Sequence, residues 1–269
     1  MRLLPLGVRG STAAPGADFV RYGGNTSCVA VLADGDEPPA LLLDAGTGIR
    51  RLPALLDGRP FEGAILLTHL HWDHVQGLPF CRSIDRDDAV VSLWLPDIGR
   101  DPAAVLSRAM SPPHFPIGPD GLRGKWTFGA LPPGRSVHAG VTVVAAEISH
   151  KGGRTYGYRV ESGGRSAAYL PDHLPVEGLP AGLLGLVGGV DVLVHDGQFL
   201  APERDTAVAF GHSTVDEAVA LAVRAGAGRL VLTHHAPDRT DAQLDEIAGA
   251  VRDAPLPVTL AAELAPILV

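Results

Sequence analysis

A run of four apolar residues, 64–67, ends abruptly in a set of metal-ligand side chains, and this junction constrains the fold more than any other stretch. The next residues read Thr-His-Leu-His-Trp-Asp-His, which places three imidazoles and one carboxylate within six positions. In an extended chain, residues i and i+2 point to the same side, so His69 and His71 leave the strand end together. A turn after them would return Asp73 and His74 toward the same point. The junction therefore predicts a strand that ends in a metal site.

Three later segments repeat this arrangement, with a ligand-type residue directly after a strand-like run. They supply His150, Asp172 and the pair His234 and His235. Taken alone, each is more often a turn or core residue than a ligand, but chance rarely places all of them beside such a motif. Imidazoles and carboxylates without thiolates suit zinc, manganese, iron or nickel. We therefore expect divalent metal ions, with zinc as the first expectation.

Short apolar runs separated by turns dominate the chain, which predicts many strands and few helices. Strands are predicted at 3–6, 26–33, 40–44, 63–68, 89–95, 141–148, 156–160, 166–170, 191–194, 230–233 and 258–260. Helical periodicity marks 49–56, 102–109, 213–225 and 242–252. The helix at 213–225 is the clearest, since Ser213 can cap it and Gly226 can end it. The order of elements predicts an α/β fold in which two similar layers pack sheet to sheet, with helices outside.

Residues 96–135 form a Pro/Gly-rich stretch that also carries Phe115 and Trp126. It is too apolar for a linker and too rich in proline for regular structure. Two interpretations stay open: a surface loop held down by its aromatic side chains, or a wall near the active site, since long loops in compact domains are often functional.

The composition excludes several classes of protein. With 46% hydrophobic residues among 269, the chain can bury a large core, and no linker divides it, so one domain over 1–269 is predicted. No run approaches the length of a membrane span, and we expect no membrane contact. Cys28 and Cys81 cannot form a disulfide framework, which predicts reduced thiols and a cytoplasmic protein. The net charge of −8 disfavours a long nucleic acid as partner.

The motif at 69–74 resembles the His-x-His-x-Asp-His hallmark of the metallo-β-lactamase superfamily, and the resemblance extends over residues 7–235. Within that superfamily, the chain is most similar to the phosphodiesterase branch that includes the tRNA 3′-processing endonucleases. The sequence His-Asp-Gly-Gln-Phe at 195–199 is similar to the branch's His-Glu-Ala-Thr motif, and Gly-His-Ser-Thr at 211–214 is similar in residue type and spacing. The resemblance implies a four-layer αββα sandwich with the site at one edge, between the sheets.

The resemblance also implies a site with two divalent ions. It assigns His69, His71 and His150 to one ion, Asp73, His74 and His234 to the second, and Asp172 to a bridge between them. Asp44 matches a position that orients a ligand histidine, although a helix cap or turn residue is the alternative for this position.

Two such ions can hold a hydroxide between them and clamp the anionic oxygens of a phosphodiester. The leaving alkoxide then needs a proton, and the resemblance assigns this role to His212, oriented by Asp196. Asp196 replaces a glutamate, so its reach is one methylene shorter. His212, Asp196 and Asp73 are thus the expected catalytic residues, while the alternative for His212 is a place at the start of the next helix.

Three side chains are candidate substrate contacts. Arg9 could pair with a phosphate bidentately, beside a loop whose Gly23 and Gly24 form either an anion nest or only a hairpin turn. Lys151 follows a ligand directly, but a solvated lysine is an equal alternative. His114 lies in the 96–135 stretch.

These residues predict a metal-dependent hydrolase of a small phosphodiester, such as a cyclic nucleotide or nucleotide diester. The alternatives are a tRNA 3′-processing endoribonuclease, a hydrolase of another ester such as a lactone, and a non-enzymatic scaffold, which would lack ligands. Only 21 residues separate His150 from Asp172, which leaves no room for the arm with which the tRNA-processing branch grips tRNA. We therefore expect a small-molecule substrate and no long nucleic acid, and the resemblance allows a homodimer.

Overall fold

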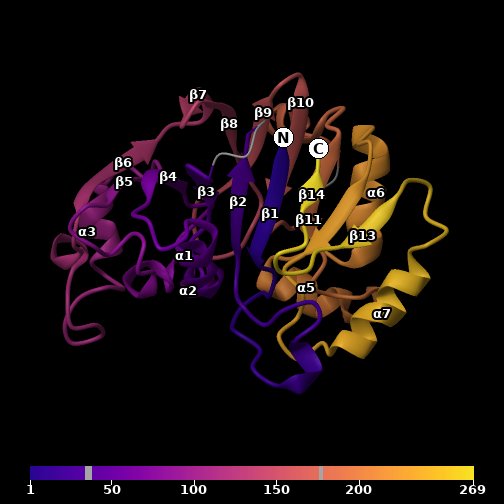
Figure 1. Ribbon diagram of the computed structural model, residues 1–269. Helices are drawn as coiled ribbons and strands as arrows, with labels where there is room; N and C mark the ends of the chain where they lie inside the picture. The colour runs from indigo at the N-terminus through magenta and orange to yellow at the C-terminus, as the bar shows by residue number, and fades with distance from the viewer. Residues whose placement is uncertain (34–37, 176–177) are drawn as a thin grey trace.

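Two seven-stranded sheets pack face to face in the computed structural model, which describes residues 1–33, 38–175 and 178–269 (Figure 1). The first sheet has the order β14 (Ile267–Leu268), β1 (Arg2–Gly7), β2 (Cys28–Leu32), β3 (Leu41–Leu43), β4 (Glu62–Leu66), β5 (Val90–Pro96) and β6 (Lys125–Leu131). The second has the order β13 (Val258–Leu260), β12 (Leu230–Thr233), β11 (Val192–Asp196), β10 (Arg165–Leu170), β9 (Thr155–Ser162), β8 (Val141–Ile148) and β7 (Gly134–His138). The first half of the chain thus builds one sheet and the second half the other, except for the C-terminal strand β14.

Alternation along the strands builds the core between the sheets. Val29 and Val31 of β2 face the second sheet, whereas Cys28 and Ala30 face the outer helices. Every second side chain of a strand points to the same face, so β2 is apolar on both sides. Such two-sided burial requires a helical layer outside each sheet.

The helices supply these outer layers. They are α1 (Leu52–Leu55), α2 (Trp72–Val75) and α3 (Pro102–Leu106) in the first half, and α4 (Ala181–Val187), α5 (Arg204–Phe210), α6 (Val215–Ala225) and α7 (Asp241–Ala250) in the second. Short 3₁₀ turns are η1 (Ala17–Phe19), η2 (Thr47–Arg51), η3 (Leu78–Phe80), η4 (Pro119–Gly121) and η5 (Ala201–Glu203). The layer order confirms the predicted αββα sandwich.

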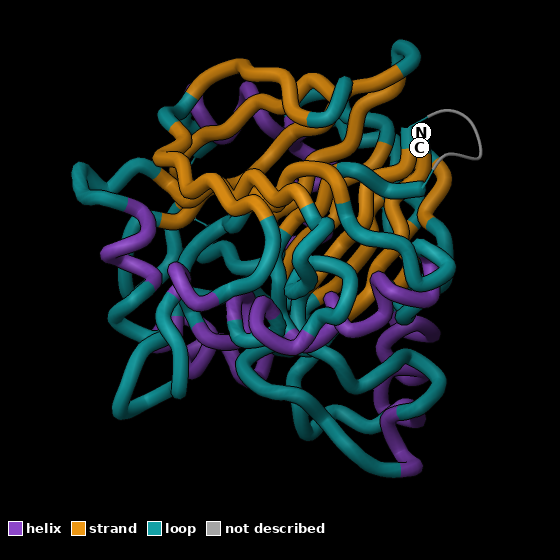
Figure 2. Tube along the Cα trace, turned by 60° about the vertical axis from the view of Figure 1, so that its left-hand side comes forward, coloured by secondary structure: helices purple, strands orange, loops and turns teal. Residues whose placement is uncertain are grey.

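The strand directions bring the ends of several strands to one edge. β3, β4, β5 and β6 are parallel, and so are β10, β11, β12 and β13. β8 and β10 are both antiparallel to β9 and therefore run the same way. Many loops gather on one side of the strands, below them in Figure 2. Residues that directly follow β4, β8, β10 and β12 can consequently meet.

Two buried tyrosine hydroxyls tie this edge together across the sheets. Tyr158 of β9 donates a hydrogen bond to the Leu67 carbonyl at 2.6 Å, one residue beyond the end of β4. Tyr169 of β10 donates to Oδ2 of Asp44, just after β3, at 3.1 Å. Both bonds link the second sheet to the first. They therefore hold the strand ends of the two sheets at a set separation.

Several elements differ from those predicted. β6 lies within the 96–135 stretch, for which we expected little regular structure, because an edge strand can form from Lys125–Leu131 alongside β5. The short elements β7, β14, α2, α4 and α5 were also not predicted. The helix α6 is capped by Thr214, whose hydroxyl accepts from the Glu217 N–H, rather than by Ser213. In the described ranges, no helix combines the length and apolar character needed to cross a membrane.

Replacing Tyr158 with phenylalanine should lower the free energy of unfolding by about 1–3 kcal/mol, because the change removes a buried donor from the Leu67 carbonyl. Denaturant unfolding followed by circular dichroism would measure the loss. Tyr22→Phe is the matched control, since the Tyr22 hydroxyl bonds to Asp245 at the surface. Equal losses in the two variants would contradict a role for the cross-sheet bond.

Candidate metal centre

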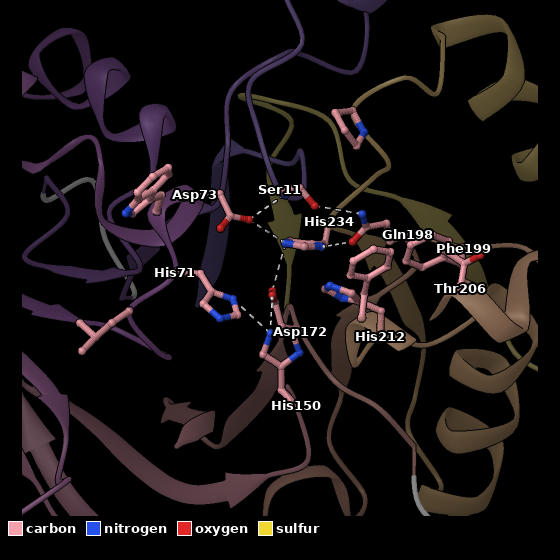
Figure 3. Close-up of a pocket in the computed structure, with 14 residues that line it drawn as sticks. Ser11, His71, Asp73, His150, Asp172, Gln198, Phe199, Thr206, His212 and His234 are labelled. Carbon is pink, nitrogen blue, oxygen red and sulfur yellow. Dashed lines mark hydrogen bonds and ion pairs between the residues drawn. The ribbon is translucent and has the colours of Figure 1, made fainter. Parts of the chain in front are cut away.

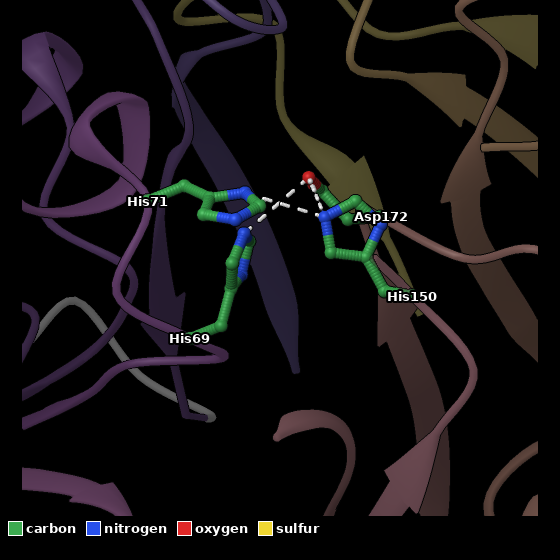
Figure 4. Close-up of side chains that lie close together, drawn as sticks. All are labelled: His69, His71, His150 and Asp172. Atoms are coloured by element: carbon green, nitrogen blue, oxygen red, sulfur yellow. Dashed lines mark hydrogen bonds and ion pairs between the residues drawn. The ribbon is translucent and has the colours of Figure 1, made fainter. Parts of the chain in front are cut away.

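Four ligand-type side chains converge where β4, β8 and β10 end (Figure 4). Nε2 of His69 and Nε2 of His150 lie 3.5 Å and 3.4 Å from Oδ2 of Asp172. Nδ1 of His71 lies 3.3 Å from Nε2 of His150. The structure thus brings together the first predicted ligand set.

A second group lies directly beside the first. Nε2 of His74 and Nε2 of His234 are each 3.1 Å from Oδ1 of Asp172. Oδ2 of Asp73 lies 3.4 Å from Nε2 of His74 and 3.2 Å from Nε2 of His234. Asp172 therefore turns one oxygen to each group, as a bridging ligand between two ions would.

Each imidazole that directs Nε2 into the site has its other nitrogen next to an oxygen. In His69, Nδ1 lies 3.0 Å from the Thr68 hydroxyl, and in His74 it lies 2.9 Å from the Asp44 carboxylate. In His150, Nδ1 lies 2.7 Å from the Gly211 carbonyl, and in His234 it lies 3.0 Å from the side-chain oxygen of Gln198. An N–H at Nδ1 that donates to these oxygens leaves the Nε2 lone pair free. Such outer contacts orient the histidines that bind metals.

Burial makes three of the histidines neutral. Desolvation lowers the pKa of His69, His71 and His150, so these imidazoles carry lone pairs near pH 7. Burial also tends to raise the pKa of Asp172, but the surrounding imidazoles, His234 foremost, outweigh it and hold this pKa well below its usual range. The site thus combines neutral nitrogen donors with an ionised carboxylate.

The surroundings of His74 show an excess of negative charge. Burial alone would lower the pKa of His74, but the carboxylates of Asp172, Asp73 and Asp44 outweigh burial and raise it well above its usual value. Three carboxylates around one imidazole favour a positive charge at this point. A divalent cation bound by Asp172 and Asp73 would supply that charge.

The donor set therefore fits divalent metal ions. Within the described residues, His69 Nε2, His74 Nε2 and Asp172 Oδ1 are fully buried and have no hydrogen-bond partner. Buried polar atoms are rarely left unpaired, because desolvation without a partner costs free energy. Three such atoms that converge on one place are what metal ligation would satisfy.

Asp44 is fully buried beside the site and accepts several hydrogen bonds. Its Oδ1 accepts from the Thr68 N–H at 2.7 Å and from the Thr68 hydroxyl at 3.0 Å, while Oδ2 lies 2.9 Å from Nδ1 of His74. The predicted role in orienting a ligand stays a proposal, and this geometry supports it over the alternative of a helix cap, because the nearest helical turn, η2, has Gly46 at its N-cap.

His212 lies at the rim of the metal groups (Figure 3) and forms a buried pair with Asp196. Nδ1 of His212 lies 2.8 Å from Oδ2 of Asp196, so the shorter aspartate does reach the imidazole. Asp196 also accepts hydrogen bonds from the backbone N–H groups of Gln198 and His173, at 3.0 Å and 3.2 Å. Burial tends to lower the pKa of His212, but the carboxylates, Asp196 foremost and then Asp172 and Asp73, outweigh this effect and raise it. The pair therefore favours a protonated imidazole.

Gly211 positions two of these residues at once. It ends α5 at a φ of 85°, which favours glycine, and its carbonyl lies 2.7 Å from Nδ1 of His150. A Cβ on Gly211 would come within 2.5 Å of the Lys151 backbone nitrogen. The chain then turns directly into His212. The resemblance found this segment, but only the structure shows that its glycine holds His150.

Two further contacts to the ligands were not predicted. The Ser11 N–H donates to Oδ2 of Asp73 at 2.7 Å, and Oε1 of Gln198 lies 3.0 Å from Nδ1 of His234. Gln198 also donates to the Ser11 hydroxyl at 3.2 Å (Figure 3). A Cβ at Gly10 would meet Nδ1 of His234 at 2.4 Å, so this glycine allows the N-terminal loop to approach. In the sequence, only the small Gly10-Ser11 pair marks the Ser11 contact, and only the place of Gln198 two residues after Asp196 marks the other contact.

The substrate-contact predictions fare differently. The prediction that Arg9 pairs with a phosphate was wrong. Arg9 is fully buried, and its guanidinium donates to the carbonyls of Gly23, Ala236 and Arg239. These bonds anchor the N-terminal loop and leave the arginine inaccessible to a phosphate. Nζ of Lys151, an exposed residue, donates to the Ala209 carbonyl at 2.6 Å.

An open cleft of about 540 Å³ lies over both metal groups. Its walls include Trp72, Phe199, Phe210 and His212 together with the predicted ligands His71, Asp73, His150, Asp172 and His234. His114 does not line this cleft and lies in a neighbouring groove. The cleft gives a substrate direct access to the site.

The purified protein should bind about two zinc ions per chain, and Asp172→Ala should bind fewer than one, because both groups share this carboxylate. His71→Ala is the matched variant and should keep about one ion, since it changes the first group alone. Elemental analysis after zinc loading and desalting measures the content, with circular dichroism to check folding. Equal zinc content in both variants would contradict a bridging role.

Solved structures confirm the fold. The metallo-beta-lactamase fold protein YhfI from Bacillus subtilis superposes with a TM-score of 0.74 at 18% identity, covering 99% of each chain. The short form of human tRNase Z superposes with a TM-score of 0.70 at 23% identity, covering 100% of this chain and 99% of that one.

A sequence relative corrects one prediction. The chain is 31% identical to a ribonuclease Z from Mycobacterium bovis (strain BCG / Pasteur 1173P2) over 234 residues, which covers 74% of this chain and 76% of the relative. We expected a long nucleic acid to be an unlikely partner, and this similarity to an enzyme named for RNA overturns that expectation. Net charge is a sum over the whole chain and does not describe the local field of a site.

The family model described as the beta-lactamase superfamily domain matches residues 40–235. These residues include the strand ends that carry all the predicted ligands and the pair of His212 and Asp196. The chain therefore belongs to the beta-lactamase superfamily, as the motif predicted, and is a metal-dependent hydrolase.

Proposed function

We propose that the protein is an endoribonuclease of the ribonuclease Z type, which hydrolyses a phosphodiester bond in a precursor tRNA. The observation that carries this proposal is the buried pair of His212 and Asp196 beside the metal groups, at 2.8 Å. The similarity to a named ribonuclease Z favours RNA over the small phosphodiester that we first expected.

The site suits an anionic phosphodiester. The donor set would hold one ion through His69, His71, His150 and Asp172, and a second through Asp73, His74, His234 and Asp172. Two bound divalent cations would supply Lewis acidity, stabilising negative charge on the phosphoryl oxygens and making water more acidic. The cleft above the donor set is open, so a phosphate can reach both groups of donors.

His212 provides what a ribose leaving group requires. An alkoxide is a poor leaving group in water, so a proton must reach its oxygen as the P–O bond breaks. Asp196 accepts the Nδ1–H of His212, which directs Nε2 away from the carboxylate as the proton donor. Because Asp196 is itself held by backbone N–H groups, the imidazole is oriented before substrate arrives.

The compact hairpin between His150 and Asp172 favours a second candidate function, the hydrolysis of a small phosphodiester such as a cyclic nucleotide. Between His150 and Asp172 the chain forms only β9, a turn at Gly163 and Gly164, and β10. This segment holds no extra domain that could reach along a tRNA. The two candidates share the site and differ in the size of substrate.

A substrate panel separates these functions. The zinc-loaded protein should cleave a precursor tRNA that carries a 3′ trailer, with kcat/KM above that for linear dinucleotides and cyclic mononucleotides. Asp172→Ala is the inactive control. Turnover of cyclic mononucleotides or linear dinucleotides without cleavage of the precursor would favour the second candidate, and turnover of lactones alone would contradict both.

His212→Ala should lower kcat on RNA by about 10²–10⁴-fold, because the variant lacks the proton donor for the alkoxide. The loss on bis(p-nitrophenyl) phosphate should stay below about tenfold, since p-nitrophenolate leaves without protonation. Metal content, measured in parallel, should equal that of the wild type. Equal losses on both substrates would rule out the donor role of His212.

A further inference from the structure

A second groove, of about 440 Å³, lies next to the metal cleft and is not used by the chemistry described above. One wall is the helical stretch of α2 and η3, and the other is the segment from the end of α3 to Phe115. Trp72 lines both the groove and the cleft. The groove therefore borders the metal cleft at Trp72.

The wall from α2 and η3 presents a stripe of side chains. Positions 72, 75, 76, 79 and 80 all line the groove, and their spacing of three and four residues places them on one side of a helical turn. The neighbours of Trp72 in the chain, His71 and Asp73, point to the metal groups instead. The same turn thus serves the metal centre on one side and the groove on the other.

Two large aromatic side chains of this stripe are exposed. The exposed fraction is 74% for Trp72 and 68% for Phe80, although aromatic residues make up only 5% of the chain. Phe115 packs edge to face against Phe80, with ring centroids 5.7 Å apart, and so holds that ring in place. Exposed apolar surface of this kind marks a binding site when it lines a groove.

The groove also favours an anionic ligand. Arg108 and His114 line it and are exposed, and the Arg108 guanidinium forms no hydrogen bond or ion pair with any residue that the structure describes. None of the described residues that line the groove is acidic. Aromatic faces combined with an unpaired cation are the elements with which proteins bind single-stranded nucleic acids.

We propose that this groove is a nucleobase subsite. A nucleotide next to the phosphate at the metal centre places its base against Trp72 and Phe80, and Arg108 contacts the phosphate beyond it. The proposal rests on the proposed function, because it assigns the groove to a nucleotide substrate. It also gives the predicted substrate contact His114 a place at the rim of this subsite.

A binding experiment tests the subsite without RNA cleavage. Adenosine 5′-monophosphate should quench the tryptophan fluorescence of the zinc-loaded protein and bind about tenfold more tightly than ribose 5-phosphate, which lacks a base. Trp72→Phe should remove most of the quenching, since the chain has three tryptophans and only Trp72 lines the groove. Equal binding of the two ligands would overturn the proposal.

Variants of Phe80 separate stacking from general apolar contact. Phe80→Ala and Phe80→Leu should each reduce the advantage of adenosine 5′-monophosphate to below about threefold, whereas Phe80→Tyr should keep it. Val137→Ala is the control, because Val137 is also exposed, at 67%, and lies on β7. Full retention in Phe80→Leu, or an equal loss in Val137→Ala, would contradict stacking.

Cleavage of RNA distinguishes the subsite from the proposed function. A substrate with one abasic nucleotide beside the cleaved bond should show a KM about tenfold above that of the intact RNA, and Phe80→Ala should abolish this difference. If no RNA is cleaved but the nucleotide preference remains, the endoribonuclease proposal fails and the subsite stands. If RNA is cleaved with no effect of the base or of Phe80, the subsite alone fails.

Discussion

The Asp44 carboxylate joins the two sheets at the edge where the metal groups form. It accepts hydrogen bonds from Thr68 of the first sheet's strand end and from the Tyr169 hydroxyl of the second sheet, and it contacts His74. A fully buried carboxylate is tolerated only when its oxygens are satisfied, so its partners are held in one arrangement. The second hydroxyl, from Tyr158, acts at Leu67 on the same edge. Ligands that lie far apart in the chain meet because these contacts set the distance between the sheets.

This arrangement accounts for the chemistry of the site. Burial keeps the imidazoles of the first group neutral, while His234 and His74 of the second group hold the pKa of Asp172 low and so keep that carboxylate ionised. Three atoms of this site, His69 Nε2, His74 Nε2 and Asp172 Oδ1, have no hydrogen-bond partner among the described residues, and divalent cations would satisfy them. Beside it, Asp196 lies against His212, so the proposed proton donor and the candidate cation site line the same cleft. The groove along Trp72 and Phe80 borders this cleft and is where the proposed nucleobase subsite lies.

The role of a residue could be predicted from the sequence when that role depends on residues close to it in the chain. His69, His71 and Asp73 could be predicted because strand geometry and a short turn place them together. Arg9 could not, because its burial depends on carbonyls from Ala236 and Arg239, which are more than two hundred residues away in the chain. Gln198 and Ser11 were missed for a related reason, since amide and hydroxyl side chains are common on any surface. The expectation about nucleic acid failed because net charge says little about a site that takes up cations.

The sequence by itself determined which residues could bind metal and which strand each of them follows, since alternation and turn signals act over a few neighbouring residues. It also indicated two packed layers with helices outside, through the order of strand-like and helical segments. The tertiary structure alone decided that Asp172 turns one oxygen to each group, that Asp196 reaches His212 despite its shorter side chain, and that Trp72 faces a second groove. These features depend on how two sheets are positioned against each other, which is set by packing among distant residues rather than by any local pattern.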